Sequence, residues 1–506
     1  MGFAEVLSRA QAGLIAPQVR VEVHIGSGLP TFTIVGLPAP AVKESRERVR
    51  AALACCGYEV PAGRITVNLS PADLPKEGGR FDLPIALGIL FASGQLQSVF
   101  DLARTEFYGE LGLTGELKGV PGLLLAALHA AGCGHALVVP QCGVGDLMPV
   151  QTAQLFGLGH LRELATAQPL STLACKPSQE VPTSYEHPPE LDDVRGQWQA
   201  KRALLLAAAG GHSLLMEGPP GSGKTMLAQR LPGLLPLLPQ SEALEVAAIM
   251  AVAQLRPGVS GAVSGLSAVP PFRSPHHTAS AHAIVGGGTA IQPGEVSLAH
   301  HGVLFLDELP EFDRRVLEAL REPLESGRVS VARANQRAEY PASFLLVAAM
   351  NPCPCGRAGQ VRPPCRCQPA QISRYRSRIS GPLLDRIDLR LRLAAVDATT
   401  LTDTEVTTPL RMDTAQARAL VCLARQRQQQ RQGKLNARLE AGETLHYVRV
   451  DSEGLAVLRK AAAIRGHSAR SQHRVLRVAR SIADLEGRDQ VIASDIGEAL
   501  SMRWDE

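Results

Sequence analysis

Apolar and polar residues alternate strictly near the start of the chain. In residues 19–25 every second position is Val or Ile, and the positions between them carry Arg, Glu or His. A period of two is typical of a strand with one buried face. Similar reasoning predicts strands at residues 31–35 and 64–69, a helix at 43–55 and a buried helix at 84–92. We therefore expect a mixed α/β domain over residues 1–167.

The pattern changes twice further along the chain. Residues 168–190 are rich in Pro and Ser and lack periodic apolar positions, which is typical of a linker. After them come a helix, a short apolar strand, a Gly-rich turn and another helix, which predicts an α/β core with a parallel sheet over residues 191–395. Over residues 396–506 we expect a helical lid domain, with an Arg/Gln-rich helix near 413–432 and a final bundle over about 450–505.

The composition excludes little by itself. Of the 506 residues, 45% are hydrophobic, and 52 basic against 48 acidic residues give a net charge of +4, which argues neither for nor against nucleic acid. The chain has no uncharged apolar run of about 18 residues, so we expect no membrane span. Its first residues lack the pattern of a signal peptide, so we expect a cytoplasmic protein. Aromatic residues make up only 4%, which does not favour extensive base stacking.

A glycine-rich segment follows the strand expected at residues 213–216. It reads Gly218, Pro219, Pro220, Gly221, Ser222, Gly223, Lys224 and Thr225, and a helix is expected at 226–231. This is GxxxxGK[ST] between a strand and a helix, the phosphate-binding loop of ATPases. Its glycines let backbone N–H groups surround phosphate oxygens, and the helix N-terminus adds partial positive charge. Lys224 is expected to reach the β- and γ-phosphates of ATP, and Thr225 to ligate Mg²⁺.

Two more buried strands are expected to end in polar groups at the same site. The apolar run at 303–306 leads directly into Asp307 and Glu308. Asp307 is expected to hold Mg²⁺, directly or through water, and Glu308 to orient and deprotonate the attacking water. The run at 345–350 leads into Asn351, whose amide can bond the same water and the γ-phosphate. The alternative interpretation is that these strands merely end in surface acids and a turn residue.

Residues 381–388 read Gly-Pro-Leu-Leu-Asp-Arg-Ile-Asp just after the expected core sheet. With the preceding motifs, this stretch resembles the AAA+ family of ATP-driven motors. The resemblance implies that Arg386 is an arginine finger, which reaches the γ-phosphate of a neighbouring subunit and stabilises charge in the transition state. A finger that acts on a neighbour implies a ring, usually a hexamer. The alternative is a salt bridge from Arg386 to Asp385 or Asp388.

The same resemblance assigns a second arginine to the lid. Residues 468–480 open the last helical region with Ser-Ala-Arg and continue as a basic helix. In the family a similar stretch supplies a sensor arginine, and Arg470 matches its position best, with Arg474 one turn later as the second choice. The alternative is a solvated basic helix face.

Four other stretches indicate which branch of the AAA+ family the chain resembles. They read Phe-Arg-Ser-Pro-His-His-Thr at 272–278, Gly-Gly-Gly at 286–288, Pro-Gly-Glu-Val-Ser-Leu-Ala-His at 293–300, and Asn-Pro-Cys-Pro-Cys-Gly at 351–356. Over nearly its whole length the chain resembles the magnesium-chelatase-like family of bacterial AAA+ proteins, in its ComM (YifB-type) branch. The resemblance implies a hexameric helicase that drives branch migration of DNA joints in natural transformation and recombination.

The resemblance also implies two insertions that face the pore of the ring. One is expected near residues 272–290 and the other as a hairpin near 328–340. The hairpin carries Arg328, Arg333 and Arg337, which could grip DNA phosphates without reading sequence. The alternative is an ordinary solvated hairpin.

A local basic block lies further along. Residues 357–392 contain nine arginines, no lysine and two acids. Nucleic-acid contact and pairing across a subunit interface are two open interpretations of it. The adjacent His276 and His277 are more typical of polar loop contacts than of metal ligands.

Four cysteines crowd into one short loop of the core. Cys353 and Cys355 are followed by Cys365 and Cys367. Four thiolates can close around one tetrahedral Zn²⁺, and a metal would stabilise a Gly/Pro/Arg-rich loop that has little apolar content. The alternatives are reduced free thiols or a redox pair.

The first domain resembles the Lon-protease-like (ribosomal S5 domain 2-like) fold around residues 68–84. In Lon a nucleophilic Ser follows a turn equivalent to Lys76-Glu77-Gly78, whereas here Gly79 and Arg80 follow. Because Ser70 precedes that turn, acyl-enzyme chemistry lacks its nucleophile. We expect a non-proteolytic domain used for DNA contact or ring assembly.

Alternative functions remain open. A magnesium-chelatase-like subunit or a protein-remodelling AAA+ ATPase would share the same motor. The cysteine cluster, the Lon-like domain and the arginine-rich stretch fit a DNA motor better than a chelatase. An ATP-dependent protease is disfavoured by the missing serine.

Overall fold

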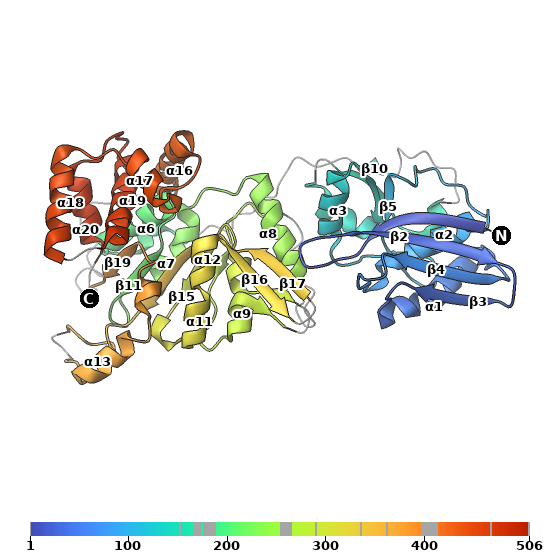
Figure 1. The fold of residues 1–506 in the computed structure, drawn as a ribbon, viewed down its shortest axis with the longest axis horizontal. Coiled ribbons are helices and arrows are strands. Elements are labelled where there is room, and N and C mark those ends of the chain that lie inside the picture. The colour runs from blue at the N-terminus through green and yellow to red at the C-terminus, as the bar shows by residue number, and fades with distance from the viewer. Residues whose placement is uncertain are drawn as a thin grey trace. The chain divides into compact units, whose positions relative to one another are not determined.

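The computed structural model describes residues 2–150, 153–164, 174–175, 189–253, 266–288, 291–333, 336–360, 363–395, 413–465 and 468–503. The chain forms two compact units (Figure 1). Unit 1 comprises Met1–Thr183 and Ala243–Ser267, and unit 2 comprises Ser184–Glu242 and Ala268–Glu506. Most of the linker expected at 168–190 lies outside the described residues. The expected α/β core and the expected lid both fall within unit 2.

Unit 1 is built on a mixed sheet with the strand order β10-β9-β8-β5-β1-β2-β4-β3. Its strands are β1 (Gly2–Arg9), β2 (Gln18–Gly26), β3 (Thr31–Val35), β4 (Arg64–Ser70), β5 (Thr105–Phe107), β8 (Ala136–Pro140), β9 (Gln154–Leu158) and β10 (Ala174–Cys175). The strands β6 (Glu110–Leu111) and β7 (Leu117–Lys118) form a separate short hairpin. The strands predicted at 19–25, 31–35 and 64–69 are confirmed as β2, β3 and β4.

The helices of unit 1 are α1 (Pro40–Cys55), α2 (Asp82–Ala92), α3 (Leu123–Gly132) and α4 (Val144–Leu147). The predicted helix at 43–55 starts earlier, at Pro40, because proline is favoured in a first helical turn. The predicted buried helix is confirmed as α2, which packs on β1 and β2. A Cβ atom on Gly88 would lie 2.4 Å from Val23 Cγ2, so the helix needs glycine to approach the sheet this closely.

The core of unit 2 is a parallel sheet with the strand order β12-β15-β18-β11-β19. Its strands are β11 (Leu214–Glu217), β12 (Phe272–Arg273), β15 (Val303–Leu306), β18 (Leu345–Met350) and β19 (Leu389–Arg392). β11 is first in the chain yet lies between β18 and β19. Parallel sheets of this kind bind ligands outside the carboxyl ends of their strands, at the point where the strand order reverses.

Both faces of this sheet are covered, which explains its continuous apolar runs. Leu214, Phe305 and Val347 belong to a hydrophobic cluster that includes α6 and α7. Their neighbours Leu304 and Leu346 belong to a second cluster on the other face. The surrounding helices of unit 2 are α6 (Trp198–Gly210), α7 (Lys224–Leu234), α9 (Ala281–Val285), α10 (Glu295–Leu298), α11 (Arg314–Ala319), α12 (Arg321–Ser326), α13 (Pro369–Arg376) and α14 (Gly381–Leu384). Helix α8 (Gln240–Ala253) begins in unit 2, and its larger part belongs to unit 1.

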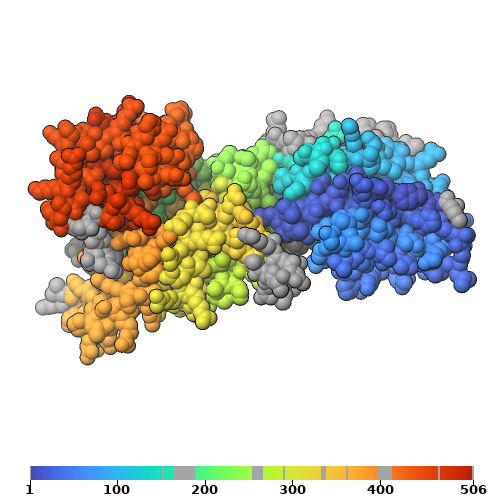
Figure 2. All heavy atoms as spheres, in the orientation of Figure 1, coloured from blue at the N-terminus to red at the C-terminus, as the bar shows by residue number. Residues whose placement is uncertain are grey.

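The lid is helical, as expected. It contains α16 (Thr414–Gln432), α17 (Ala441–Tyr447), α18 (Ser452–Arg465), α19 (Ala469–Leu485) and α20 (Ala493–Ser501). α16 and α19 share the first hydrophobic cluster with the core strands, so the lid packs directly on the core (Figure 2). Inside the lid, the fully buried Arg480 lies 3.0 Å from Asp484. Among the described residues, no helix is long and apolar enough to cross a lipid bilayer.

Candidate active site

The loop between β11 and α7 carries the predicted phosphate-binding sequence. α7 starts at Lys224, inside the motif and slightly before the predicted helix start. Gly221 and Gly223 have φ angles of 79° and 84°, a region that side chains with a Cβ rarely adopt. The N–H of Gly218 donates to Met350 O at 3.1 Å, which ties the start of the loop to β18. The backbone therefore curves around the N-terminus of α7, where an anion is favoured.

Lys224 lies in the hollow of this loop and is only 9% exposed. Its Nζ donates to Gly218 O at 2.7 Å, Pro219 O at 2.9 Å and Asn351 Oδ1 at 3.3 Å. Burial lowers the pKa of Lys224, and the two carboxylates that follow β15 partly oppose this shift. The structure thus brings Lys224 and Asn351 together, as the sequence predicted.

Thr225 and Asp307 also meet at this edge of the sheet. Thr225 Oγ1 donates to Asp307 Oδ2 at 2.8 Å. Two oxygen ligands this close can share one hard cation such as Mg²⁺. Ser222 is 1% exposed, and its Oγ has no hydrogen-bond partner among the described residues. A buried hydroxyl donor in a phosphate loop fits a phosphate oxygen, so these residues fit Mg²⁺ and ATP.

Glu308 has an unusual backbone conformation. Its φ is 53°, in the left-handed region, and its N–H donates to Asp307 Oδ1 at 2.9 Å. Such outliers cost free energy and cluster at functional sites. The half-exposed carboxylate lies 3.2 Å from His277 Nδ1. Sequence reasoning did not assign His277 to this site, because no motif spacing connects the two residues.

Arg386 lies at the opposite end of the sheet, where β11 and β19 begin. It precedes β19, which pairs with β11 from Leu389 alongside Leu214, and Ser213 Oγ donates to Arg386 O at 2.8 Å. The phosphate loop follows the other end of β11. A strand of four residues spans roughly 13 Å, so Arg386 is well separated from the phosphate loop of its own chain.

Arg386 pairs with neither of the acids that the alternative interpretation proposed. Its guanidinium bonds to the carboxylate of Glu325 and donates to Pro382 O at 2.6 Å. Arg474 instead lies 3.7 Å from Asp385 and 3.8 Å from Asp388. Asp388 also lies 3.0 Å from His212 Nδ1, so these acids are shared between the lid arginine and the core.

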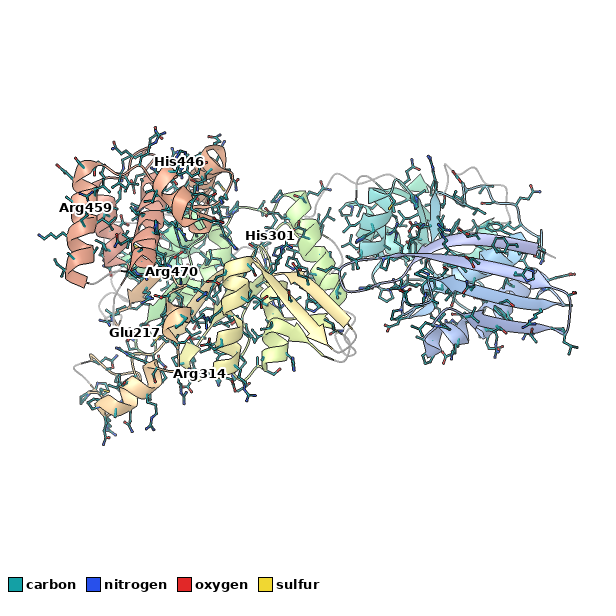
Figure 3. The ribbon with its side chains drawn as sticks, viewed as in Figure 1. Glu217, His301, Arg314, His446, Arg459 and Arg470 are labelled. Carbon is teal, nitrogen blue, oxygen red and sulfur yellow. The ribbon has the colours of Figure 1, made fainter. Side chains whose placement is uncertain are left out.

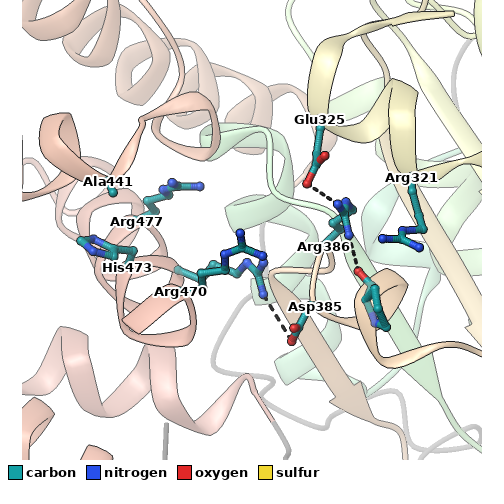
Figure 4. Close-up of a pocket in the computed structure, with 10 residues that line it drawn as sticks. Arg321, Glu325, Asp385, Arg386, Ala441, Arg470, His473 and Arg477 are labelled. Carbon is teal, nitrogen blue, oxygen red and sulfur yellow. Dashed lines mark hydrogen bonds and ion pairs between the residues drawn. The ribbon is translucent and has the colours of Figure 1, made fainter. Parts of the chain in front are cut away.

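Arg386 and the lid arginines line one pocket of about 450 Å³ (Figure 4). Its basic side chains are Arg321, Arg386, Arg470, His473, Arg474 and Arg477. Glu325 and Asp385 are its acidic side chains. Arg470 is exposed on the lid helix α19, whereas Glu217 is on the core strand before the phosphate loop (Figure 3). The two arginines predicted to act on ATP therefore share a site away from their own Lys224.

The four cysteines of residues 353–367 form a cluster. Cys353 Sγ lies 3.4 Å from Cys355 Sγ and 3.6 Å from Cys365 Sγ, and all four sulfurs are within 4.8 Å of one another. A tetrahedral Zn²⁺ with Zn–S of about 2.3 Å requires sulfurs about 3.8 Å apart, whereas a disulfide requires about 2.05 Å. The residues fit Zn²⁺.

The cysteine loop touches the phosphate loop. A Cβ atom on Gly356, which has a φ of 75°, would lie 2.6 Å from Pro220 Cδ. Arg376, which follows the cluster on α13, donates to Glu217 Oε1 at 2.7 Å. Glu217 directly precedes Gly218. A displacement of the cysteine loop would therefore shift the loop that is expected to bind phosphate.

The two expected insertions are in contact with each other. The first contains α9, β13 (Gly286–Gly287) and β14 (Gln292–Pro293). The second is confirmed as a hairpin of β16 (Arg328–Arg333) and β17 (Gln336–Pro341). Tyr340 Oη donates to Ile291 O at 3.0 Å and joins them. Arg328 is 71% exposed and pairs with Glu339 at 2.9 Å, while the side chains of Arg333 and Arg337 lie outside the described residues.

Several arginines of residues 357–392 form ion pairs with glutamates of the same chain. Arg376 and Arg392 both pair with Glu217, and Arg378 pairs with Glu311 at 2.7 Å. Charge counting could not predict these pairs, because Glu217 and Glu311 lie outside the block. In the adjacent histidine pair, His276 Nδ1 lies 2.9 Å from Thr278 Oγ1, the polar loop contact that we expected.

Comparison with family models matches three parts of the chain. Residues 190–401 match the model described as magnesium chelatase, subunit ChlI. Residues 21–142 match the model for subunit ChlI of Mg-chelatase, and residues 411–503 match its C-terminal model.

Two relatives match this chain over almost its whole length, and a third matches part of it. The competence protein ComM of Haemophilus influenzae is 46% identical over 99% of this chain and 98% of its own. The YifB protein of Escherichia coli is 45% identical over 99% of this chain and 97% of its own. A chloroplast magnesium-chelatase subunit of Arabidopsis thaliana, ChlI-2, is 27% identical over 42% of this chain and 46% of its own.

Proposed function

Because the chain belongs to the ComM/YifB branch of the magnesium-chelatase-like AAA+ family, we propose that it is an ATP-driven, hexameric DNA helicase. In this proposal it drives branch migration of DNA joints in natural transformation and recombination, in the cytoplasm. Its family implies a P-loop ATPase. The observation that carries the ATPase is the meeting of Lys224, Thr225, Asp307 and Asn351 around one phosphate loop.

The proposed hydrolysis uses groups from three neighbouring strand ends. Lys224 and the loop N–H groups bind the β- and γ-phosphates, and Thr225 and Asp307 hold Mg²⁺, which supplies charge neutralisation when bound. Glu308 takes a proton from the attacking water, and Asn351 orients that water and the γ-phosphate. Burial lowers the pKa of Lys224, and the carboxylates of Asp307 and Glu308 partly oppose this shift.

The position of Arg386 supports the proposed ring. In this proposal Arg386 and Arg470 reach the γ-phosphate bound to a neighbouring copy, because both line a pocket at the amino ends of the strands. A heterologous contact in which each chain offers one edge to the next can close into a ring. We propose that the ring has six copies, because rings of the AAA+ family are usually hexamers.

DNA is the proposed substrate partner. The match over 99% of the chain to a competence protein supports a role in transformation. The exposed Arg328 on the β16–β17 hairpin gives an insertion that can bind phosphates without reading sequence, and we propose that Arg333 and Arg337 do the same. We also propose that unit 1 is a non-proteolytic Lon-like domain for DNA contact or assembly. Its Lys76 is buried and donates to Pro71 O, which is consistent with a structural role.

Zinc is the proposed ligand of Cys353, Cys355, Cys365 and Cys367. The metal would hold the loop that contacts Pro220 and thereby shape the phosphate site. Metal analysis of the purified protein should find one zinc per chain. A metal-free preparation with four reactive thiols would exclude this part of the proposal.

ATP hydrolysis with and without DNA tests the main proposal. We expect strong stimulation by single-stranded and four-way-junction DNA, and none in the Glu308→Gln variant. Strand exchange on junctions would then test branch migration. Hydrolysis that ignores every DNA would contradict a DNA motor and favour a chelatase-like or protein-remodelling role.

A further inference from the structure

The cysteine loop and α13 carry positive charge without any acidic residue. Between Cys353 and Leu384 the chain has six arginines, no lysine and neither Asp nor Glu. α13, drawn in orange, projects from the rest of unit 2 (Figure 1). Three of the arginines in this segment are exposed and are here called the lobe arginines: Arg357, Arg366 and Arg374.

The charge of the lobe arginines is not neutralised inside the chain. The nearby glutamates are already paired with other arginines, because Glu217 binds Arg376 at 2.7 Å and Glu311 binds Arg378 at 2.7 Å. In the part of the chain that the structure describes, the side chains of the lobe arginines make no hydrogen bond or ion pair. Three guanidinium groups are therefore available to an anionic partner.

The fold of the cysteine loop turns two of these side chains outward. The N–H of Cys367 donates to Cys365 Sγ at 3.4 Å, and Arg366 lies between these two residues. In the same way, the N–H that follows Arg357 donates to Cys353 Sγ at 3.3 Å. Because the backbone is turned toward the sulfurs, both arginine side chains remain on the outside, where they are exposed.

α13 is attached to the core by the residues that follow Arg374. Tyr375 is only 5% exposed and belongs to a hydrophobic cluster of the core. Arg376 donates to Glu217 Oε1 at 2.7 Å. The lobe arginines thus extend from a backbone that is held in place. Binding a ligand there costs little ordering of the main chain.

The neighbouring surface fits nucleic acid better than a second protein. Among the described residues 353–360 and 363–378, no large apolar side chain is exposed. Apart from arginine, the exposed residues there are Pro, Gly, Ala, Gln, Ser and one Cys. A stable protein interface needs apolar or aromatic anchors at its centre. Phosphate oxygens, in contrast, are bound by Arg and small polar side chains, and a guanidinium can bind them through two parallel bonds.

The lobe arginines and the β16–β17 hairpin lie at opposite ends of one strand. The hairpin ends at Pro341, shortly before β18 begins, and the cysteine loop follows directly after β18. Six residues of a strand span roughly 20 Å. Two basic surfaces at this separation can hold two different segments of a DNA molecule, which a joint with several arms provides.

We propose that Arg357, Arg366 and Arg374 form a second DNA-binding surface, which holds the phosphates of a duplex arm while the β16–β17 hairpin binds another segment. Recognition is independent of sequence, because only the backbone of the DNA is contacted. This inference rests on the proposed DNA motor and adds the place where an arm of the joint is bound.

A full-length variant that combines Arg357→Ala, Arg366→Ala and Arg374→Ala tests the proposal. Its affinity for a four-way junction is measured over a range of salt concentrations. The slope of log affinity against log salt should become shallower by about 2.7, because each lost phosphate contact contributes about 0.9. Affinity for a short single-stranded oligonucleotide should be unchanged. Zinc content and Tm should also be unchanged, because the three side chains have no partner among the described residues.

Arg378→Ala is the matched control for each of the three single variants. It removes the same charge from the same segment, but from a side chain that is paired with Glu311. Its junction slope should equal that of the wild type, whereas each single lobe variant should be shallower by about 0.9.

Three results would overturn the second surface. They are an unchanged junction slope in the triple variant, an equal loss of affinity for the oligonucleotide, and loss of ring assembly in sedimentation with ATP. The last result would assign the lobe arginines to a contact with a neighbouring subunit. If the wild type binds no DNA, the proposed function itself fails. If it binds the junction and the triple variant keeps the same slope, only this inference fails.

Discussion

The two edges of the parallel sheet in unit 2 differ in chemistry. At the carboxyl ends of β11, β15 and β18 lie a phosphate loop, one buried lysine and acidic or amide side chains. At the amino end of β19 lies a pocket with five arginines, a histidine and two acids. One edge can bind and activate a nucleotide, and the other offers an excess of positive charge with no phosphate loop of its own.

Under the proposed function, this difference makes a single chain an incomplete ATPase. Phosphoryl transfer needs both a cradle for the ground state and positive charge for the transition state. Within one chain these groups lie at opposite ends of strands, and the four residues of β11 span roughly 13 Å. A second copy whose amino edge meets the first copy's carboxyl edge would complete the site.

The largest effect is expected from Arg386→Ala. Loss of an arginine finger lowers kcat by about 10³-fold. If the finger acts on a neighbour, an equal mixture with Lys224→Ala subunits should regain activity, because about a quarter of ring interfaces then combine an intact loop with an intact arginine. A mixture no more active than its components would show that the two edges do not meet.

The next largest effect should separate binding from chemistry at the carboxyl edge. Glu308→Gln should lower kcat by about 10²-fold or more while ATP still binds, because only the proton acceptor is lost. Lys224→Ala should weaken ATP binding itself. Fluorescent-nucleotide titration with single-turnover kinetics measures both. Equal loss of binding in the two variants would contradict the roles assigned here.

A smaller effect is expected from Gly356→Ala. The added Cβ would meet Pro220 Cδ at 2.6 Å, so the phosphate loop must shift and ATP affinity should fall about tenfold. Gly359→Ala is the matched control, since Gly359 has a φ of 84° but no atom within 4 Å of the added Cβ. Zinc content should be unchanged in both. Equal ATP affinities of the two variants would mean that the cysteine loop does not support the nucleotide edge.

The smallest effect concerns the hairpin, which joins β18 at the amino edge. Arg328→Ala should change the free energy of unfolding by less than about 1 kcal/mol, because its pair with Glu339 is exposed. The slope of log DNA affinity against log salt should become shallower by about 0.9 if Arg328 contacts one phosphate. Basal ATP hydrolysis should be unchanged. An unchanged salt slope would remove Arg328 from the DNA surface.

Several features of unit 2 are encoded in short stretches of the sequence and can be predicted from them. The phosphate loop, the acidic pair after β15 and Asn351 after β18 were predictable, because each is a short motif at the end of an apolar run. The cysteine cluster was predictable for the same reason, since all four thiols lie on one loop. The order of helix, apolar strand, Gly-rich turn and helix predicts the parallel sheet. The helix starts at Pro40 in unit 1 and Lys224 in unit 2 differ from the predicted starts by a few residues.

The contacts between these local features could not be predicted, because they depend on how distant segments pack together. Strand order and register set the contact of His277 with Glu308, the position of Arg386 at the edge opposite its own Lys224, and the approach of Gly356 to Pro220. Glu217 and Glu325 became partners of distant arginines in the same way. Hydrophobic patterning fixes which face of a strand is buried, but neighbours in a sheet are chosen by packing among segments far apart in the chain.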